Sequence, residues 1–375
     1  MKGSIRKRGD SWQIIYELPR DTAGSRKQGR QTVHGTKRDA DAKLREILTA
    51  LDKGAYITPT KETLGAFLVH WLEAYGATNT SPRTLKDYRG IVRRYLIPVL
   101  GDTPLVALRP GHVQDLYAYM QGRGLSPLTI LHTHRLLREA ISYAVKWGLL
   151  GRNVCDSATP PRPARTEMAA MDAETVERFE TACEVSAFGD LFKVALRTGL
   201  RRSEILALKW DSVDLEKRTL RVVAGLHRLP QQGMVLLPTK TAKSRRQISF
   251  SQEVVDILRS IRGSQLVSQA TLGPAWNSTG YVFTRPDGRC LDPEAATRAF
   301  TAMARSIGRS DLHFHSLRHT HASLMLAAGV HPKVVSERLG HSSISVTMDI
   351  YSHVLPGLQE DAVDRLEKLL ARSRV

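Results

Sequence analysis

The stretch Thr198-Gly199-Leu200-Arg201-Arg202-Ser203-Glu204 places an arginine after a glycine, and His315-Ser316-Leu317-Arg318-His319-Thr320 places a histidine three residues before another arginine. Glycine readily ends a helix, because it adopts the left-handed conformation that helix termini favour. Positions three apart on a helix lie on one face. We therefore predict that Arg201, at the end of one helix, and Arg318, beside His315 on another, converge on one site.

Three further motifs add a lysine, another histidine and a tyrosine: Thr239-Lys240-Thr241, Leu339-Gly340-His341 and Asp349-Ile350-Tyr351-Ser352-His353. Together the five motifs resemble, in order and spacing, the motif set of the tyrosine recombinases, in particular the integrases of phages and conjugative elements. The tyrosine stands ten residues after the histidine of Leu-Gly-His, as in that family. The resemblance covers the whole chain, weakly in its first 160 residues.

The resemblance implies that Tyr351 attacks a DNA phosphodiester and forms a 3′-phosphotyrosine. Such an ester conserves the energy of the broken bond, so the strands can be rejoined without ATP. Negative charge builds on the non-bridging oxygens during the attack. Planar, permanently charged guanidiniums offer paired donors for those oxygens, and Arg201 and Arg318 suit that role.

By the same resemblance, the other motif residues transfer protons or donate hydrogen bonds. His315 assists deprotonation of the tyrosine, because a phenol ionises by itself only at about pH 10. His341 donates a hydrogen bond to the phosphate, and Lys240 protonates the leaving 5′ oxygen. Lys243 lies three residues further along the same predicted hairpin and is the alternative general acid.

Each of these residues alone has a more ordinary interpretation. An isolated arginine is usually a surface or ion-paired side chain, and an isolated tyrosine a half-buried aromatic. The ordered co-occurrence of five motifs favours catalysis instead. Glu204 is interpreted as structural, holding Arg201 by charge or capping its helix. Ser316 and His321 replace residues that are often acidic and aromatic in the family, but neither has a proposed catalytic role.

A competing hypothesis is a metal site, because a cluster of histidines is a legitimate ligand pattern. The residues concerned are His313, His315, His319 and His321. No acidic residue or cysteine lies among them, whereas a hydrolytic nuclease usually holds its ions with carboxylates. We therefore expect neither a metal ion nor another cofactor.

Basic residues exceed acidic ones, with 55 Lys and Arg against 37 Asp and Glu and a net charge of +18. This excess predicts a polyanionic partner. No run approaches the roughly 18 apolar residues of a membrane span, and residues 1–9 lack a signal peptide's apolar stretch, so nucleic acid is favoured over a membrane. Cys155, Cys183 and Cys290 are widely separated, which predicts no disulfide framework and fits a reducing cytoplasm.

The composition and hydrophobic patterns predict a multi-domain α+β protein that begins with a small DNA-binding domain. Residues 1–57 should form a three-stranded sheet plus one helix, N-capped by Thr36, and bind arm-type DNA sites. Residues 1–60 carry 13 Lys and Arg against 7 Asp and Glu, an excess of 6. That is a third of the net charge in about a sixth of the chain.

Two further domains are expected. Residues 62–155 should form a helical core-binding bundle of about four helices, two of which begin at Ser81-Pro82 and Ser126-Pro127. Its basic residues could form either a solvated or a phosphate-binding face. After an extended proline-rich linker at 152–164, residues 165–375 should form the mixed, mainly α catalytic domain with a small β-sheet. Helices should alternate there with short strands, and one helix is expected around Glu253–Ile261.

The sequence is therefore interpreted as a site-specific recombinase that integrates or excises a prophage or other mobile element. Its expected partners are double-stranded DNA attachment sites and further copies in a homotetramer, with a DNA-bending protein and a directionality factor as possible accessories. Val363, Leu366 and Leu370 follow helical spacing and could dock on a neighbouring copy or on their own domain. Two alternatives are a type IB topoisomerase that relaxes DNA and a non-catalytic DNA-binding regulator.

Overall fold

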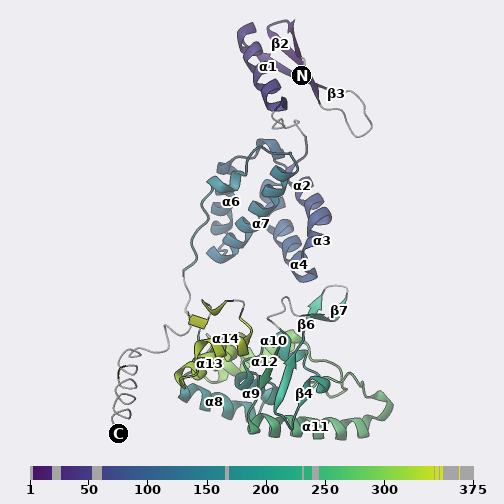
Figure 1. Ribbon diagram of the computed structural model, residues 1–375, viewed down its shortest axis with the longest axis vertical. Coiled ribbons are helices and arrows are strands. Elements are labelled where there is room, and N and C mark those ends of the chain that lie inside the picture. The colour runs from purple at the N-terminus through teal and green to yellow at the C-terminus, as the bar shows by residue number, and fades with distance from the viewer. Residues whose placement is uncertain are drawn as a thin grey trace, which may run out of the picture. The chain divides into compact units, whose positions relative to one another are not determined.

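The computed structural model describes residues 3–18, 27–52, 61–164, 169–229, 232–238, 245–341, 343–345, 347–348 and 363. The chain divides into two compact units, Met1–Arg165 and Thr166–Val375 (Figure 1). Helices predominate in both units, and the strands form small antiparallel sheets. This arrangement confirms the predicted multi-domain α+β class.

The first unit begins with a small sheet covered by one helix. Its elements are β1 (Gly3–Arg8), β2 (Ser11–Leu18), β3 (Lys27–His34) and α1 (Lys37–Asp52). The strands pair in the order β1-β2-β3. Ile14 and Tyr16 on β2 are buried together with Ala40 and Ile47 of α1. The predicted cap is confirmed, since the Thr36 hydroxyl accepts a hydrogen bond from the Asp39 amide at 3.3 Å.

The helical part of this unit forms its own core. Its elements are α2 (Leu64–Trp71), η1 (Leu72–Gly76), α3 (Ala77–Asn79), α4 (Pro82–Ile91), η2 (Val92–Leu96), α5 (Ile97–Leu100), η3 (Leu105–Ala107), α6 (Pro110–Gly122), α7 (Pro127–Lys146) and η4 (Val154–Ser157). The π-helical turns η1 and η2 join short α segments into longer helices. As predicted, the Ser81 and Ser126 hydroxyls cap α4 and α7 by accepting from the amides of Thr84 and Thr129.

The predicted linker is shorter than expected. Val154 and Cys155 are buried in the core of the bundle, and Ala158 packs beside them. Asn153 holds this turn, because its side chain accepts a hydrogen bond from the Cys155 amide and donates one to the Arg138 carbonyl. The proline-rich composition concealed this apolar anchor, so the stretch without regular structure begins only after it.

The second unit alternates helices with short strands, as predicted. Its elements are α8 (Ala173–Glu184), α9 (Gly189–Thr198), α10 (Arg202–Leu206), η5 (Trp210–Ser212), β4 (Val213–Asp214), β5 (Thr219–Val222), β6 (Ala224–Leu229), β7 (Gly233–Pro238), β8 (Arg246–Ser249), α11 (Gln252–Leu272), η7 (Gly273–Ala275), α12 (Pro293–Ser306), α13 (Phe314–Ala327) and α14 (Pro332–Leu339). Phe179, Phe192, Phe300 and Phe314 join four of the helices in one buried core.

Two details of this unit differ from the sequence-based expectation. Helix α11 continues to Leu272, whereas we expected it to end near Ile261. Gly263 costs an exposed helix only about 1 kcal/mol relative to alanine, which is too little to end it.

The strands on either side of residues 239–244 also do not form the expected hairpin with each other. Strand β7 pairs with β6, and β8 pairs with β5. The β5–β8 pairing places Ile248 opposite Leu220, and both side chains are buried there. Within the described ranges, no helix is long and apolar enough to cross a membrane.

Candidate active site

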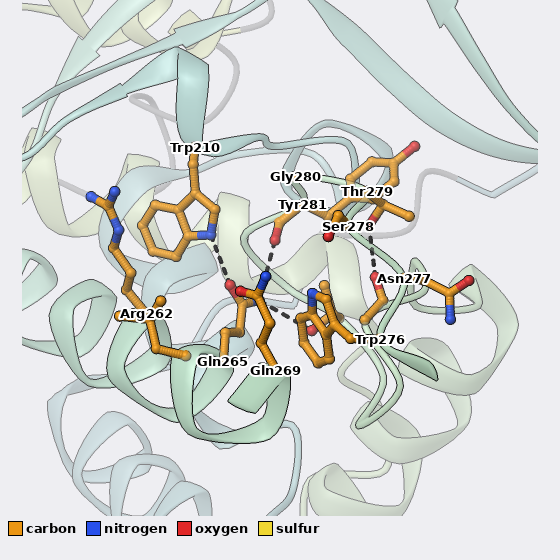
Figure 2. A pocket seen from close by; sticks show the side chains of 13 residues that line it. Trp210, Arg262, Gln265, Gln269, Trp276, Asn277, Ser278, Thr279, Gly280 and Tyr281 are labelled. Carbon is orange, nitrogen blue, oxygen red and sulfur yellow. Dashed lines mark hydrogen bonds between the residues drawn. The ribbon is translucent and has the colours of Figure 1, made fainter. Parts of the chain in front are cut away.

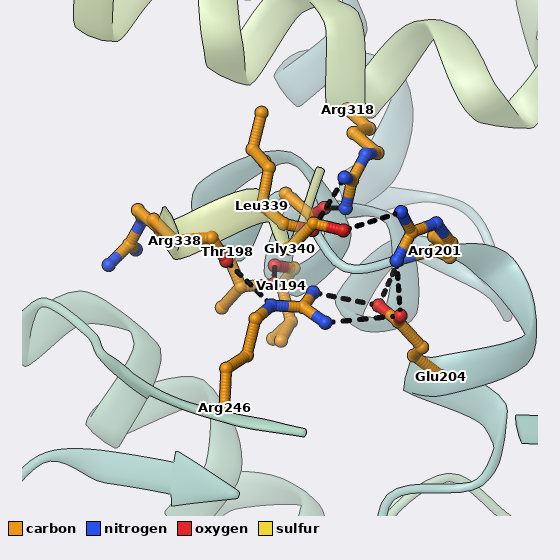
Figure 3. Close-up of polar contacts among 10 residues, drawn as sticks. Val194, Thr198, Arg201, Glu204, Arg246, Arg318, Arg338, Leu339 and Gly340 are labelled. Carbon is orange, nitrogen blue, oxygen red and sulfur yellow. Dashed lines mark hydrogen bonds and ion pairs between the residues drawn. The ribbon is translucent and has the colours of Figure 1, made fainter. Parts of the chain in front are cut away.

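Arg201 stands where two helices meet. Helix α9 ends at Gly199 in the left-handed conformation, with φ +67°, and Arg201 is the N-cap of α10. A Cβ atom at Gly199 would lie 2.6 Å from a methyl carbon of Leu339, so only glycine fits this turn. The Arg201 guanidinium donates to a Glu204 carboxylate oxygen at 2.7 Å and to the Gly340 carbonyl at 3.0 Å (Figure 3).

Glu204 has both of the structural roles considered for it. One carboxylate oxygen pairs with the Arg201 guanidinium, and the other accepts a hydrogen bond from the Arg201 backbone amide at 2.9 Å. Burial raises the pKa of Glu204, but hydrogen bonds and charge from Arg246, followed by Arg201, outweigh it and hold this pKa below its usual range. The carboxylate is therefore ionised and fixes Arg201 at neutral pH.

His315 and Arg318 both lie in the first turns of α13, as predicted. Arg318 is only 2% exposed, and it donates hydrogen bonds to the carbonyls of Gly199 and Leu339. Ser316 occupies the position where the family often has an acidic residue. Its hydroxyl accepts a hydrogen bond from the His313 amide and so caps the helix as a carboxylate would.

His341 follows the end of α14, where Gly340 is left-handed with φ +65°. The Nδ1 atom of His341 lies 2.7 Å from the hydroxyl of Thr347, a residue that is fully buried. This hydrogen bond fixes the orientation of the imidazole ring and leaves Nε2 for another partner. Thr347 is thus a positioning contact that the motif analysis missed.

Arg201 and Arg318 donate to the adjacent carbonyls of Gly340 and Leu339, next to His341, and His315 lies on the same helix as Arg318, so the four residues form one cluster. Burial lowers the pKa of His315 to about 4, with further contributions from His319, Arg318 and Arg201. Burial, followed by Arg318 and Arg201, lowers the pKa of His341 to about 4 as well. Both imidazoles are therefore neutral at pH 7. Burial and then the charge of Arg201 lower the pKa of Arg318 to about 9, so it remains cationic.

Two of the predicted site residues, Lys240 and Tyr351, lie outside the described residues, as does Lys243. After α14, the structure describes residues 340–341, 343–345 and 347–348, so the last described residue before the tyrosine lies three positions from it. The predicted tail stripe is described only at Val363.

The histidines of the competing metal hypothesis have other contacts. His321 is buried, with Nδ1 2.9 Å from the Leu196 carbonyl and Nε2 3.0 Å from Nε of Arg338. Because arginine can only donate, Nε2 of His321 accepts, and Nδ1 carries the proton. His315 and His319 stack edge to face at 4.8 Å between ring centroids. Across the described ranges, no three His, Cys, Asp or Glu side chains are grouped to hold a metal ion.

A second polar feature of this unit lies apart from the arginine cluster. A cavity of about 230 Å³ lies between α11 and the loop near Tyr281, and none of the candidate residues lines it (Figure 2). Gln265 organises this cavity by accepting from the Trp210 indole at 2.8 Å and donating to the Val282 carbonyl at 2.9 Å.

Sequence reasoning also missed two partly buried arginines. Arg246 contacts Glu204, and Arg338 contacts His321. No motif marked them, because Arg246 is one of several basic residues in Lys243-Ser244-Arg245-Arg246 and its partner lies 42 positions earlier.

We expect acid to destabilise this unit partly through His321. Burial, and then the charge of Arg338, lower its pKa from 6.5 to about 4 in the folded chain. Folding therefore favours the neutral ring, and its stabilisation is complete above about pH 6.5 and is lost as the pH falls toward 4. Between pH 7 and pH 4.5, His321 should account for a fall of about 2 kcal/mol in the free energy of unfolding.

The measurement is urea unfolding at both pH values, followed by hydrogen exchange of peptides from α9 and α13. His321→Gln should reduce the pH dependence, whereas the control His132→Gln, at an exposed position of α7, should retain the wild-type dependence. Equal pH dependence in wild type and His321→Gln would contradict this account of the histidine.

The chain is similar to known integrases and recombinases over most of its length. The model of the phage integrase family matches residues 169–357, and that of the phage integrase N-terminal SAM-like domain matches residues 63–121. A tyrosine recombinase XerC-like protein from Caldanaerobacter subterraneus is 29% identical over 377 residues, which cover 96% of both chains. An integrase from Streptomyces ambofaciens is 29% identical over 364 residues, covering 94% of this chain and 92% of that protein.

The fold is also found among solved structures. The Tn1549 transposon integrase, in complex with a circular intermediate DNA, superposes with a TM-score of 0.70 at 20% identity, covering 81% of this chain and 99% of that one. The phage integrase model alone spans half of the chain and includes the whole arginine and histidine cluster. The protein therefore belongs to the phage integrase family of tyrosine recombinases, the enzymes that transfer DNA strands in site-specific recombination.

Proposed function

We propose that the protein recombines double-stranded DNA attachment sites of a prophage or other mobile element through a covalent bond between Tyr351 and a 3′ phosphate. The observation that carries the proposal is the convergence of Arg201, His315, Arg318 and His341, which come from three separate motifs, on one small region. Cationic donors beside neutral imidazoles are what phosphoryl transfer to a hydroxyl requires.

The two arginines have complementary environments for binding a phosphate. The Arg201 side chain is 34% exposed and can be reached from solvent, whereas Arg318 is buried. A guanidinium has five N–H donors, and the Glu204 and Gly340 contacts of Arg201 engage two of them. We assign the direct phosphate contact to Arg201, and we place the buried Arg318 beneath the phosphate, where its charge stabilises the site.

The proton transfers are assigned to the remaining motif residues. His315 is neutral at pH 7, so it can accept the proton that Tyr351 loses on attack. His341 donates from Nε2 to a non-bridging oxygen if the Thr347 hydroxyl donates to its Nδ1. Lys240 returns a proton to the leaving 5′ oxygen, with Lys243 as the alternative.

Recombination requires two duplexes and two cuts in each, so we propose that four copies act together on DNA. A DNA-bending protein and a directionality factor would assist by shaping and selecting the attachment sites.

The buried, unpaired Cys155 and Cys183 suit the reducing cytoplasm as the place of this reaction. Membership of the integrase family disfavours the topoisomerase and regulator alternatives.

The first test of this function is cleavage without metal. A nicked suicide substrate should yield an SDS-resistant protein–DNA adduct in EDTA at the rate seen with magnesium, because arginines, lysine and histidines supply the positive charge that a metal ion would bring. Adduct yield is followed on denaturing gels. Loss of cleavage on chelation, restored by a divalent ion, would contradict the proposed chemistry and revive the histidine metal site.

We propose that the amino-terminal domain, residues 1–57, binds arm-type DNA away from the chemistry. The face of its sheet opposite α1 carries Arg6, Arg8 and Arg30, all exposed, beside Gln13. A chain beginning at Lys61 should therefore still cleave core-site substrates but lose recombination of full attachment sites. In the intact chain this domain would bind a second DNA site and strengthen the joint binding by about 10²- to 10⁴-fold, so we expect recombination to fall by roughly that factor without it.

Recombination and cleavage assays on both chains test this prediction. In the intact protein, Arg6→Ala with Arg30→Ala should weaken arm-site binding and reduce its salt dependence. Lys43→Ala is the matched control, because Lys43 lies on α1 and pairs with Glu46. Full recombination by the shortened chain would show that residues 1–57 are not an arm-binding domain.

A further inference from the structure

The end of helix α14 accepts hydrogen bonds from three arginines. The consecutive carbonyls of Arg338, Leu339 and Gly340 accept from Arg246 Nε at 2.7 Å, Arg318 Nη2 at 2.5 Å and Arg201 Nη2 at 3.0 Å (Figure 3). The last carbonyls of a helix lack intrahelical partners and form the negative end of its dipole, so cationic donors are favoured there. Two of these arginines belong to the family motifs, and the third, Arg246, does not.

Arg246 also makes a paired contact with Glu204. Its Nη1 and Nη2 atoms donate to the two carboxylate oxygens at 3.1 and 2.8 Å. Both side chains are almost fully buried, with 6% of Arg246 and 5% of Glu204 exposed. A buried, two-point ion pair has a fixed geometry, unlike a surface pair that exchanges with water.

Glu204 transmits that geometry to Arg201. Its carboxylate lies between the guanidiniums of Arg246 and Arg201, and it also binds the Arg201 amide (Figure 3). Gly340 permits the close approach of Arg246, since a Cβ atom there would lie 3.1 Å from the Arg246 side chain. Arg246 on β8 is thus linked through one carboxylate to the proposed phosphate ligand.

We propose that Arg246 is a positioning residue of the active site: by holding Glu204 and the end of α14, it fixes the direction of the Arg201 guanidinium. The inference rests on the proposed function, because it takes Arg201 as the phosphate ligand. Arg246 itself touches no reacting atom and acts through Glu204.

A lysine cannot replace Arg246 in this role. An ammonium is a single point charge, so it cannot span both carboxylate oxygens and the Arg338 carbonyl in one plane. Glu204 would then keep only its contacts with Arg201, so the carboxylate and the Arg201 guanidinium could shift together. A displacement of about 1 Å at a reacting centre can cost about 100-fold in rate.

Single-turnover cleavage of a suicide substrate by Arg246→Lys tests the proposal. Cleavage should be about 10- to 100-fold slower, while the Kd for core-site DNA stays at the wild-type value. Arg221→Lys is the matched control. Arg221 lies on the neighbouring strand β5 and also donates to a backbone carbonyl, that of Asp211, but away from Glu204. Wild-type cleavage by Arg246→Lys would overturn the inference.

A double-mutant cycle separates positioning from general loss of structure. If Arg246 acts through Arg201, adding Arg246→Lys to Arg201→Lys should slow cleavage by less than about threefold further, because the group it positions is already gone. A purely structural role predicts that the two losses multiply, and that result would overturn the proposal.

Hydrogen exchange across α9 to α14 would reveal whether Arg246→Lys misfolds. If it does, a second variant still tests the proposal. Glu204→Gln keeps the shape of the side chain but removes its charge, and it should show the same slower cleavage and the same lack of additivity with Arg201→Lys. If the losses of Glu204→Gln and Arg201→Lys multiplied in the double variant, the inference would also be overturned. Failure of the wild-type chain to form any adduct would instead contradict the proposed function.

Discussion

Replacing Tyr351 by phenylalanine should abolish the covalent protein–DNA adduct. The substitution removes only the hydroxyl, so DNA binding should persist while cleavage falls by at least about 10⁴-fold, the scale expected when a nucleophile is lost. A radiolabelled suicide substrate and a denaturing gel measure the adduct, and a mobility shift measures binding.

Tyr281→Phe provides the matched control in the same unit. Tyr281 is a buried tyrosine beside Lys209, whose ammonium lies 5.3 Å from the ring centroid, and it is absent from the arginine cluster. The Tyr281→Phe variant should cleave DNA at the wild-type rate. An SDS-resistant complex that persisted in Tyr351→Phe would exclude Tyr351 as the nucleophile.

Replacing Arg201 by lysine should have the second-largest effect, slowing cleavage by about 10²- to 10³-fold although the charge is retained. The lysine cannot bind two phosphate oxygens while keeping the Glu204 and Gly340 contacts that orient the arginine. Single-turnover cleavage at saturating enzyme separates this effect from weaker DNA binding.

The control for Arg201→Lys is Arg228→Lys, because Arg228 forms an exposed ion pair with Asp292 on the same unit. It should leave cleavage unchanged. Near-normal cleavage by Arg201→Lys would contradict its role as a phosphate ligand. Arg318→Lys should be impaired as well, but it also removes hydrogen bonds to two carbonyls, so its folding must be measured alongside.

Local sequence signals were sufficient for much of the fold. The Ser-Pro pairs at 81–82 and 126–127 predicted two helix starts, because a capping hydroxyl and a proline act within one turn. The glycine at 199 likewise predicted the turn that presents Arg201. Such signals depend on neighbouring residues, so they can be recognised without knowledge of the tertiary structure.

What the sequence could not predict depends on distant contacts. The pairing of β8 with β5 follows from the burial of Ile248 against Leu220, which lies 28 positions earlier. The contact of Arg246 with Glu204 depends on that same pairing, since β8 carries Arg246. The four described motif residues could be found by resemblance, whereas Arg246 and Thr347 required the folded arrangement.

Peptide mapping of the covalent adduct identifies the residue that is bonded to DNA, which we expect to be Tyr351. The adduct from a suicide substrate would be digested with protease and nuclease, and the nucleotide-bearing peptide sequenced by mass spectrometry. We expect a single modified peptide with the phosphate on Tyr351 and the nucleotide attached through its 3′ oxygen. A phosphate on any other residue, or attachment through the 5′ oxygen, would contradict it.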